Sequence, residues 1–257
     1  CLVGSEMCIR DRLWIFSPWR PTFSFRFHPL LELLPFSSKL LFTSLFTHIN
    51  NNIFSALLGR FYTIQQAGYY SQGSKWTTMG YSTIFGMINS VGQPVFREAS
   101  EDRQRLQNIF RKLMRFTAFV SFPAMLGLAI VSQELIVISI TEKWLPCVPV
   151  MQILCVWGAF MPISTLYSNL MNSIGRPNVY MWNTIALGIF QLLCVWGSYP
   201  YGLNIMLIVY TAANIFWLLI WHYFAHKHIG ISLLNTLKDI APYLIISVAV
   251  MTFTYWV

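Results

Sequence analysis

Charged residues are scarce in this sequence of 257 residues: 10% are Asp, Glu, Lys or Arg, whereas 56% are hydrophobic. A soluble globular domain usually has about 25% charged residues. The composition therefore argues against a soluble enzyme and, with a mean hydropathy of +0.54, favours an integral membrane protein. The chain has 17 basic and 9 acidic residues. Because basic residues set the orientation of membrane proteins, this excess indicates topology, and we expect no nucleic acid partner.

Signatures of metal sites, disulfide frameworks and hydrolases are missing as well. The five cysteines, at positions 1, 8, 147, 155 and 194, include no C-x-x-C pair. No G-x-S-x-G, P-loop or H-E-x-x-H motif occurs. His222 and His226 share a helix face, but no third ligand follows at a fixed spacing, so interfacial histidines are the favoured interpretation. We predict no catalytic residue, no metal and no cofactor.

Long apolar runs dominate what is present. A spanning helix needs about 20 mostly apolar residues. The sequence contains seven such runs, at approximately 38–59, 77–97, 116–138, 147–170, 179–199, 203–225 and 240–257. The fold class that we predict is therefore all-α, a polytopic transmembrane helical bundle with about seven spans.

The run at 77–97 is the weakest, because it contains several polar residues, and the distribution of basic residues tests it. If all seven runs span, 14 of the 17 basic residues lie on one side, and only Arg60, Lys75 and Lys143 lie on the other. Without the run at 77–97 the split becomes 6 to 11. The positive-inside rule favours the first arrangement, so this run is expected to span and the start of the chain to be cytoplasmic.

The segments outside the runs suggest how the chain is divided. Residues 1–12, CLVGSEMCIRDR, look like translated sequencing-adapter read-through and are excluded from functional reasoning. Residues 13–37 mix aromatic residues, prolines and arginines and are interpreted as a cytoplasmic, interfacial segment. Residues 98–115 have apolar positions at helical spacing among basic ones, which predicts an amphipathic helix on the cytoplasmic face. A connector held by anionic lipid is the favoured interpretation, and docking of a partner is the alternative. The last run stops at Val257 without polar flanks, so we expect a piece of a longer protein.

A polar stripe follows one face of the first run. At 100° per residue, one face collects five polar residues, namely Ser44, His48, Asn51, Asn52 and Ser55, and ends near Arg60. Polar groups in hydrocarbon are costly, so the stripe must face other helices or a wet cavity. Interhelical hydrogen bonding is the structural alternative; a cavity wall for a polar substrate is the interpretation that we favour. Asn89, Gln93 and Arg97 extend the candidate cavity, with Asn183 and Gln191 as weaker additions.

The order of several segments resembles a known family. SSKLLFTSLFTHINNNIFSALLGRFYTIQQAGYYSQG is followed by RLQNIFRKLMRFTAFVSFPAMLGLAI, EKWLPCVPVMQILC and NSIGRP. This succession, across about residues 13–257, resembles the carboxyl lobe of bacterial polysaccharide and O-antigen flippases, in the multidrug/oligosaccharidyl-lipid/polysaccharide exporter superfamily. VGQPVFREAS departs from the family, which more often has an apolar stretch there.

The resemblance implies a transporter of twelve to fourteen helices in two lobes around a central cavity. Residues 13–37 would join the lobes, 38–225 would form the six-helix carboxyl lobe, and 226–257 a cytoplasmic loop and a truncated seventh helix. The cargo would be an undecaprenyl-diphosphate-linked oligosaccharide that crosses the bacterial inner membrane, with membrane lipids and a polysaccharide polymerase as further partners. Cations such as Lys39, Arg60 and Arg97 would meet the diphosphate, unless they only snorkel to the interface.

Two alternatives remain open at this point. A multidrug antiporter of the same superfamily would show an intramembrane carboxylate for ion coupling, and none is evident here. A membrane-embedded polymerase or glycosyltransferase would show a large outward loop with acidic or basic residues, and the outward loops predicted here are short.

Overall fold

The structure of the protein is a computed structural model that describes residues 34, 37–38, 41–48 and 58–256. The chain divides into two compact units, residues 1–37 and residues 38–257. Apart from residues 34 and 37, the first unit, with the predicted segments 1–12 and 13–37, lies outside the described residues. The fold concerns the second unit.

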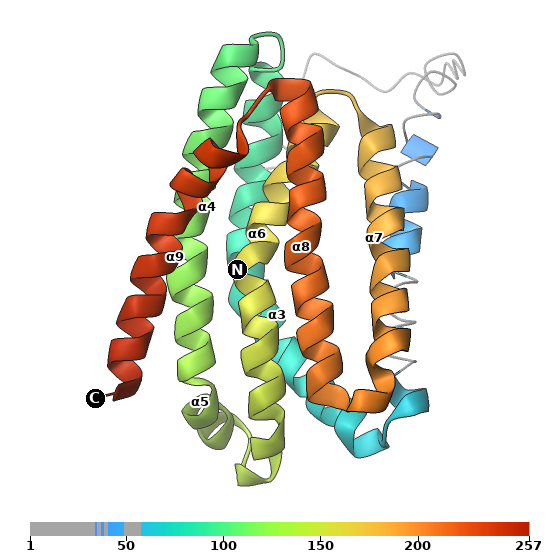
Figure 1. Cartoon of the computed structure of the whole chain (residues 1–257), viewed down its shortest axis with the longest axis vertical. Coiled ribbons are helices and arrows are strands. Elements are labelled where there is room, and N and C mark those ends of the chain that lie inside the picture. Colours follow the sequence, from blue (N-terminus) through green and yellow to red (C-terminus); the bar gives the residue numbers. More distant parts are fainter. Residues whose placement is uncertain (1–33, 35–36, 39–40, 49–57, 257) are drawn as a thin grey trace, which may run out of the picture. The chain divides into compact units, whose positions relative to one another are not determined.

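The second unit is a bundle of long helices, and no strand occurs in the residues that the structure describes (Figure 1). Short helical stretches at 41–48 and 58–61 precede it. The labelled elements are α3 (Ile64–Glu98), α4 (Arg103–Ile130), α5 (Ser132–Ser139), η1 (Glu142–Cys147), α6 (Val148–Ser173), α7 (Pro177–Ser198), η2 (Tyr199–Tyr201), α8 (Leu203–Ile229) and α9 (Leu233–Trp256). The central helix is α6, which packs against α3, α4 and α8, while α7 packs on α8 and α9 packs on α4.

Five helical segments are long and apolar enough to cross a membrane. They are Arg103–Ile130, Glu142–Ser173, Pro177–Tyr201, Leu203–Ile229 and Leu233–Thr254. Each contains or overlaps one of the last five runs predicted from the sequence. The all-α membrane fold is therefore confirmed, with five candidate spans among the described residues.

The first two predicted spans have a different status. Residues 49–57 lie outside the described part of the chain. The run at 77–97 lies inside the 35-residue helix α3, which is not among the five apolar segments. This helix begins at Ile64, because Thr63 and Gln66 form a capping box: Thr63 Oγ1 accepts from the Gln66 N–H, and Gln66 Oε1 accepts from the Thr63 N–H. Seven spans stay a prediction.

The predicted amphipathic helix at 98–115 is not a separate element. Asp102 caps α4, accepting hydrogen bonds from the backbone N–H groups of Gln104 and Arg105. The helix then continues without a break to Ile130. The apolar residues Leu106 and Phe110 are 3% and 1% exposed. The apolar face of this predicted helix therefore packs in the protein core, and the contact of its basic residues with anionic lipid stays a prediction.

Two other predicted boundaries need correction. The run at 116–138 is divided at Val131, where α4 ends and the short helix α5 follows. The predicted cytoplasmic loop after residue 225 is largely helical, because α8 continues to Ile229 and α9 begins at Leu233. Gly230 makes this tight connection possible by adopting a left-handed conformation, with φ of 83°, that favours glycine.

Close packing joins α3 to α6. A Cβ atom on Gly73 would lie 3.1 Å from Val150 Cγ1 and 3.2 Å from the backbone nitrogen of Met151. Small residues let membrane helices approach this closely. Further along the same interface, Gly158 of α6 faces Thr77 of α3. The two helices are therefore closely packed, and several of the polar residues described below lie on them.

Candidate functional site: a polar interior in an apolar bundle

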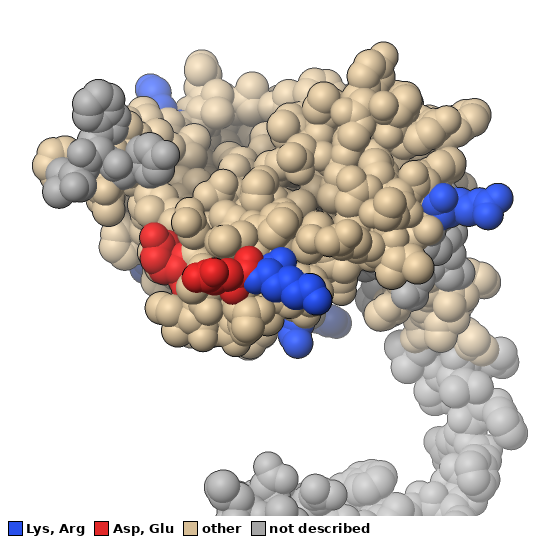
Figure 2. All heavy atoms as spheres, turned by 90° about the horizontal axis from the view of Figure 1, so that it is seen from below, with Lys and Arg blue, Asp and Glu red and all other residues tan. Residues whose placement is uncertain are grey.

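The two ends of the bundle differ in charge. One end, here called the basic end, lies where α3 and α6 finish, where α4 and α7 begin, and where α8 meets α9 (Figure 1). Nine of the twelve described basic residues belong to it: Arg97, Arg103, Arg105, Arg111, Lys112, Arg115, Arg176, Lys227 and Lys238. Arg60, Lys75 and Lys143 lie toward the other end, where charged side chains are few and most of the visible surface is uncharged (Figure 2).

At the basic end, α4 holds the turn between α8 and α9. Arg103 Nε donates to the carbonyl oxygen of Ile229 at 2.7 Å, and Gln107 Nε2 donates to the same oxygen. Four carbonyls at a helix C-terminus lack partners within the helix, so these donors satisfy a group that would otherwise be left without one. Arg111 and Arg115 both pair with Asp239 at the start of α9. The basic end is thus tied together by arginines.

The predicted site residues on α3 are partly brought together. Asn89 and Gln93 both bind Asn169 of α6: Asn169 Nδ2 donates to Asn89 Oδ1 at 2.9 Å, and Gln93 Nε2 donates to Asn169 Oδ1 at 3.1 Å. Ser173 Oγ also donates to the carbonyl oxygen of Gln93. Asn169 itself is 3% exposed, whereas Gln93 is exposed. This cluster is an interhelical hydrogen-bond network at the surface of the α3–α6 interface. Arg97, in the last turn of α3, is exposed.

The predicted stripe on the first run is described only in part. Ser44 and His48 are exposed, and so is Arg60 beyond the gap. Asn51, Asn52 and Ser55 lie outside the described residues. Two neighbours of the stripe, Phe46 and Thr47, line a pocket in the bundle.

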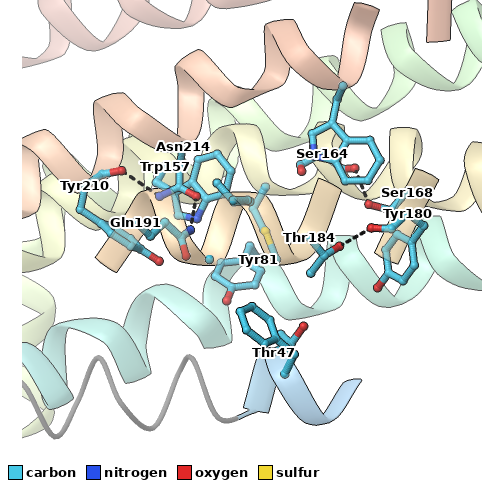
Figure 3. A pocket seen from close by; sticks show the side chains of 15 residues that line it. Thr47, Tyr81, Trp157, Ser164, Ser168, Tyr180, Thr184, Gln191, Tyr210 and Asn214 are labelled. Carbon is cyan, nitrogen blue, oxygen red and sulfur yellow. Dashed lines mark hydrogen bonds between the residues drawn. The ribbon is translucent and has the colours of Figure 1, made fainter. Parts of the chain in front are cut away.

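This pocket, here called the polar pocket, has a volume of about 280 Å³ and lies among residues 46–47, α3, α6, α7 and α8 (Figure 3). Six hydroxyl or amide side chains line it: Thr47, Ser164, Ser168, Thr184, Gln191 and Asn214. Six aromatic residues complete much of the wall: Phe46, Tyr81, Trp157, Tyr180, Tyr210 and Trp221. Among the described residues that line it, none is Asp, Glu, Lys, Arg or His.

Hydrogen bonds orient the amides of the polar pocket. Gln191 Nε2 of α7 donates to Asn214 Oδ1 of α8 at 2.7 Å, and Asn214 Nδ2 donates to the carbonyl oxygen of Tyr210 at 2.8 Å (Figure 3). Outside the lining residues, the same pair of helices is joined again by Trp217 Nε1, which donates to Asn183 Oδ1 at 2.6 Å. Of the two weaker sequence candidates, Gln191 therefore belongs to the pocket and Asn183 to the helix interface.

Most lining residues were missed at the sequence level. Thr184, Ser168 and Asn214 are polar residues inside predominantly apolar runs, which is a signal that could have indicated them. The aromatic residues gave no such signal, because tyrosine and tryptophan are common throughout this chain. Only the packing of four helices brings them to one cavity.

The histidines have separate partners. His222 Nδ1 lies 3.2 Å from the hydroxyl of Tyr167 on α6, and His226 Nδ1 lies 2.8 Å from the carbonyl oxygen of Ile231. Among the residues that the structure describes, no three His, Cys, Asp or Glu side chains gather as a metal site would require. The pair is bound into the packing at the end of α8.

Comparison with known proteins decides the family. Residues 3–149, more than half of the chain, match the family described as "Polysaccharide biosynthesis protein". The chain belongs to this family. The resemblance found in the sequence is confirmed at that level. The match begins within the segment 1–12, whose interpretation as an artefact stays a prediction.

Three relatives of the chain have names that also refer to membrane proteins or to polysaccharide biosynthesis. The chain is 28% identical, over 61% of its length, to an "Uncharacterized membrane protein in cps region" of Klebsiella pneumoniae. It is 27% identical, over 67% of its length, to the "Lipopolysaccharide biosynthesis protein WzxC" of Escherichia coli K12. It is 25% identical, over the same share, to the "Teichuronic acid biosynthesis protein TuaB" of Bacillus subtilis 168.

These alignments cover 33%, 35% and 36% of the three relatives. The chain thus spans about a third of the length of the curated relatives that it matches. No solved structure matches the chain. Together with the five apolar helices, the family assignment makes this a multi-pass membrane protein of polysaccharide biosynthesis.

Proposed function

We propose that this polysaccharide biosynthesis protein is a lobe of a transporter that moves an undecaprenyl-diphosphate-linked oligosaccharide across the bacterial inner membrane. The oligosaccharide would be the repeat unit of an O-antigen or of a capsular or exopolysaccharide. The observation that carries this proposal is the uncharged polar pocket inside a bundle of apolar helices. The family and the names of the relatives supply the class of cargo.

The transport mechanism follows from the cost of placing polar groups in hydrocarbon. An unpaired polar group in an apolar medium costs several kcal/mol, so a glycan cannot cross the lipid core unaided. A cavity lined by hydroxyl and amide groups replaces its hydration, while the acyl chain remains in lipid. Two lobes that rock around such a cavity would open it to one side at a time.

The charge asymmetry supports an orientation. Cytoplasmic loops of membrane proteins carry an excess of Lys and Arg. The basic end holds nine of the twelve described basic residues, so we place this end in the cytoplasm. The start of the chain would then also be cytoplasmic.

The candidate cavity residues are proposed to line the same passage as the polar pocket. Ser44 and His48 belong to the helical stretch whose Phe46 and Thr47 already line that pocket. Asn51, Asn52 and Ser55 would continue the wall. Asn89 and Gln93 would extend it on α3, and Arg60 and Arg97 would meet the diphosphate at opposite ends of the passage.

The antiporter alternative is less well supported. An ion-coupled antiporter needs an intramembrane carboxylate that can be protonated or can bind a cation. No Asp or Glu is present among the described residues lining the polar pocket. Asp239, the buried carboxylate of α9, is neutralised by Arg111 and Arg115.

Deleting the gene tests the function. Lipid-linked repeat units should accumulate with the glycan on the cytoplasmic face, and surface polysaccharide should be lost. The complete gene product should restore both. Unchanged surface polysaccharide together with increased sensitivity to cationic drugs would instead support the antiporter.

A double variant tests the cavity assignment within that function. Asn51→Leu combined with Asn52→Leu in the complete protein should reduce export while the amount of folded protein stays normal, because two candidate hydrogen-bonding groups are removed. Thr252→Leu is the matched control, since it replaces an exposed polar residue of α9. Full export by the double variant would show that Asn51 and Asn52 do not contribute to the cavity.

A further inference from the structure

We propose that the polar pocket binds an uncharged sugar of the cargo and does not bind its diphosphate. This inference rests on the proposed function and divides recognition between two places. The sugar would sit among α3, α6, α7 and α8, and the phosphates would be held elsewhere in the passage.

The absence of charge in the pocket is the first argument. Proteins bind phosphate groups with Arg, Lys or clustered backbone N–H groups, because the hydrogen bonds are strengthened by charge. The described lining contains no cation, and its wall comes from the interior of helices, where backbone N–H groups are already used. A diphosphate would lose its hydration there without a cation to compensate its charge.

The aromatic wall is the second argument. Sugar rings present C–H groups with partial positive charge on their faces, and aromatic faces carry partial negative charge. Tyr81 of α3, Trp157 of α6 and Tyr210 of α8 bring aromatic rings from three different helices to one pocket. Such a wall suits a ligand that is apolar on its faces and polar at its edges.

The arrangement of the hydroxyl groups is the third argument. Thr184 Oγ1 donates to the carbonyl oxygen of Tyr180 at 2.9 Å, and Ser168 Oγ donates to that of Ser164 at 3.2 Å (Figure 3). Since each hydroxyl has one hydrogen and two lone pairs, both oxygens keep the capacity to accept. They can therefore take hydrogen bonds from the hydroxyl groups of a sugar.

The lining also contains hydrogen-bond donors. Tyr81 and Tyr210 have hydroxyl groups, and Gln191 has a side-chain amide. Trp221 also lines the pocket, but its Nε1–H, which has no hydrogen-bond partner in the described part of the chain, is buried and is not presented to a ligand. The pocket would thus offer both donors and acceptors to a polyhydroxyl ligand.

Thr184 provides the sharpest test, because α9 has a matched control. Thr252 is also a helical threonine, and its Oγ1 donates to the carbonyl oxygen of Val248 at 2.8 Å, but it is exposed and outside the pocket. Thr184→Leu places a larger, apolar side chain in the pocket and removes the hydroxyl. Thr184→Val keeps the volume of the side chain and removes only the hydroxyl. It therefore tests the role of this hydroxyl in binding if Thr184→Leu fails to fold. The controls are Thr252→Leu and Thr252→Val.

Binding is measured on the complete gene product in nanodiscs. The probe is the tritium-labelled repeat-unit oligosaccharide of the host polysaccharide, prepared without lipid and without phosphate. We expect saturable binding that Thr184→Leu abolishes and Thr184→Val weakens about fivefold, as expected for one hydrogen bond. Both Thr252 variants should bind normally, and inorganic pyrophosphate should not displace the sugar.

Several results would overturn the inference: no saturable binding by the wild type, normal binding by both Thr184 variants, or displacement of the sugar by pyrophosphate. Transport of the lipid-linked unit is measured in parallel in proteoliposomes. If the wild-type protein transports this unit and the Thr184 variants bind the sugar normally, the proposed function stands and the inference about the pocket is wrong. Specific sugar binding at Thr184 without transport by the wild type would support the binding site and contradict the proposed function.

Discussion

The guanidinium group of Arg111 on α4 donates two hydrogen bonds to the carboxylate of Asp239 on α9, from Nε to Oδ2 at 2.7 Å and from Nη2 to Oδ1 at 3.1 Å. Arg115 Nε adds a third contact, at 2.9 Å from Oδ1. The Asp239 side chain is 6% exposed, whereas those of Arg111 and Arg115 are 31% and 50% exposed. The carboxylate therefore depends on its arginines, while each arginine retains access to water.

This asymmetry predicts the order of stability among variants. Asp239→Ala should lower the free energy of unfolding by about 2 kcal/mol, because it removes every contact of the cluster and leaves two cations facing each other. Arg115→Ala should cost less than about 1 kcal/mol, because Arg111 still pairs with the buried carboxylate and Arg115 is half exposed. Unfolding by dodecyl sulfate in mixed micelles measures both values. Equal losses from the two variants would contradict this description of the cluster.

Packing between α3 and α6 gives a second prediction. Gly73→Leu should destabilise the protein by about 3 kcal/mol or more, since the new side chain meets Val150 and the backbone of Met151, which cannot move independently of α6. Gly86→Leu is the matched control on the same helix, because a Cβ atom there would meet nothing within 4 Å. Thermal unfolding of the purified protein compares them. A similar melting temperature for both variants would exclude close packing at Gly73.

The sequence predicted the spanning helices more reliably than their ends. Apolar runs indicated α6, α7 and α8 within about four residues at each end, because a spanning helix needs a long and mostly apolar segment. The start of α3 depends on the capping box of Thr63 and Gln66, a local signal that was present but not used. The continuity of α4 depends on a tertiary effect, namely that Leu106 and Phe110 are buried by neighbouring helices.

The residues of the candidate site were harder to predict from the sequence than the helices. Periodicity relates residues on one helix, so it could indicate that Asn89 and Gln93 lie on the same side of α3. It could not reveal that Asn169, 76 residues beyond Gln93, would bridge them. The polar pocket is harder still, because α3, α6, α7 and α8 each contribute residues to it. Such a site exists only once the helices have packed.

The bridge through Asn169 gives a third prediction. Interhelical hydrogen bonds in membrane proteins contribute about 0.6 kcal/mol each on average. A double-mutant cycle of Asn89→Ala and Asn169→Ala should therefore give a coupling energy of about 0.6 kcal/mol, measured by unfolding in mixed micelles. A cycle of Asn169→Ala with Ser90→Ala is the control, since Ser90 Oγ donates to the carbonyl oxygen of Met87 on its own helix. Coupling in the control but not with Asn89 would contradict the network.

Orientation in the membrane can be decided with two introduced cysteines. Glu101 lies in the turn between α3 and α4 at the basic end, and Glu142 lies in η1 toward the other end; both are exposed. Glu101→Cys and Glu142→Cys are introduced singly into the complete gene product, in a background whose native cysteines are replaced. If the basic end is cytoplasmic, a membrane-impermeant maleimide should label Glu142→Cys in intact spheroplasts and Glu101→Cys only after permeabilisation. The two variants control each other, because both lie in short connections and both replace a glutamate. Labelling of Glu101→Cys alone in intact cells would reverse the orientation, and the passage proposed for the glycan would then open to the cytoplasm at the end with few charges.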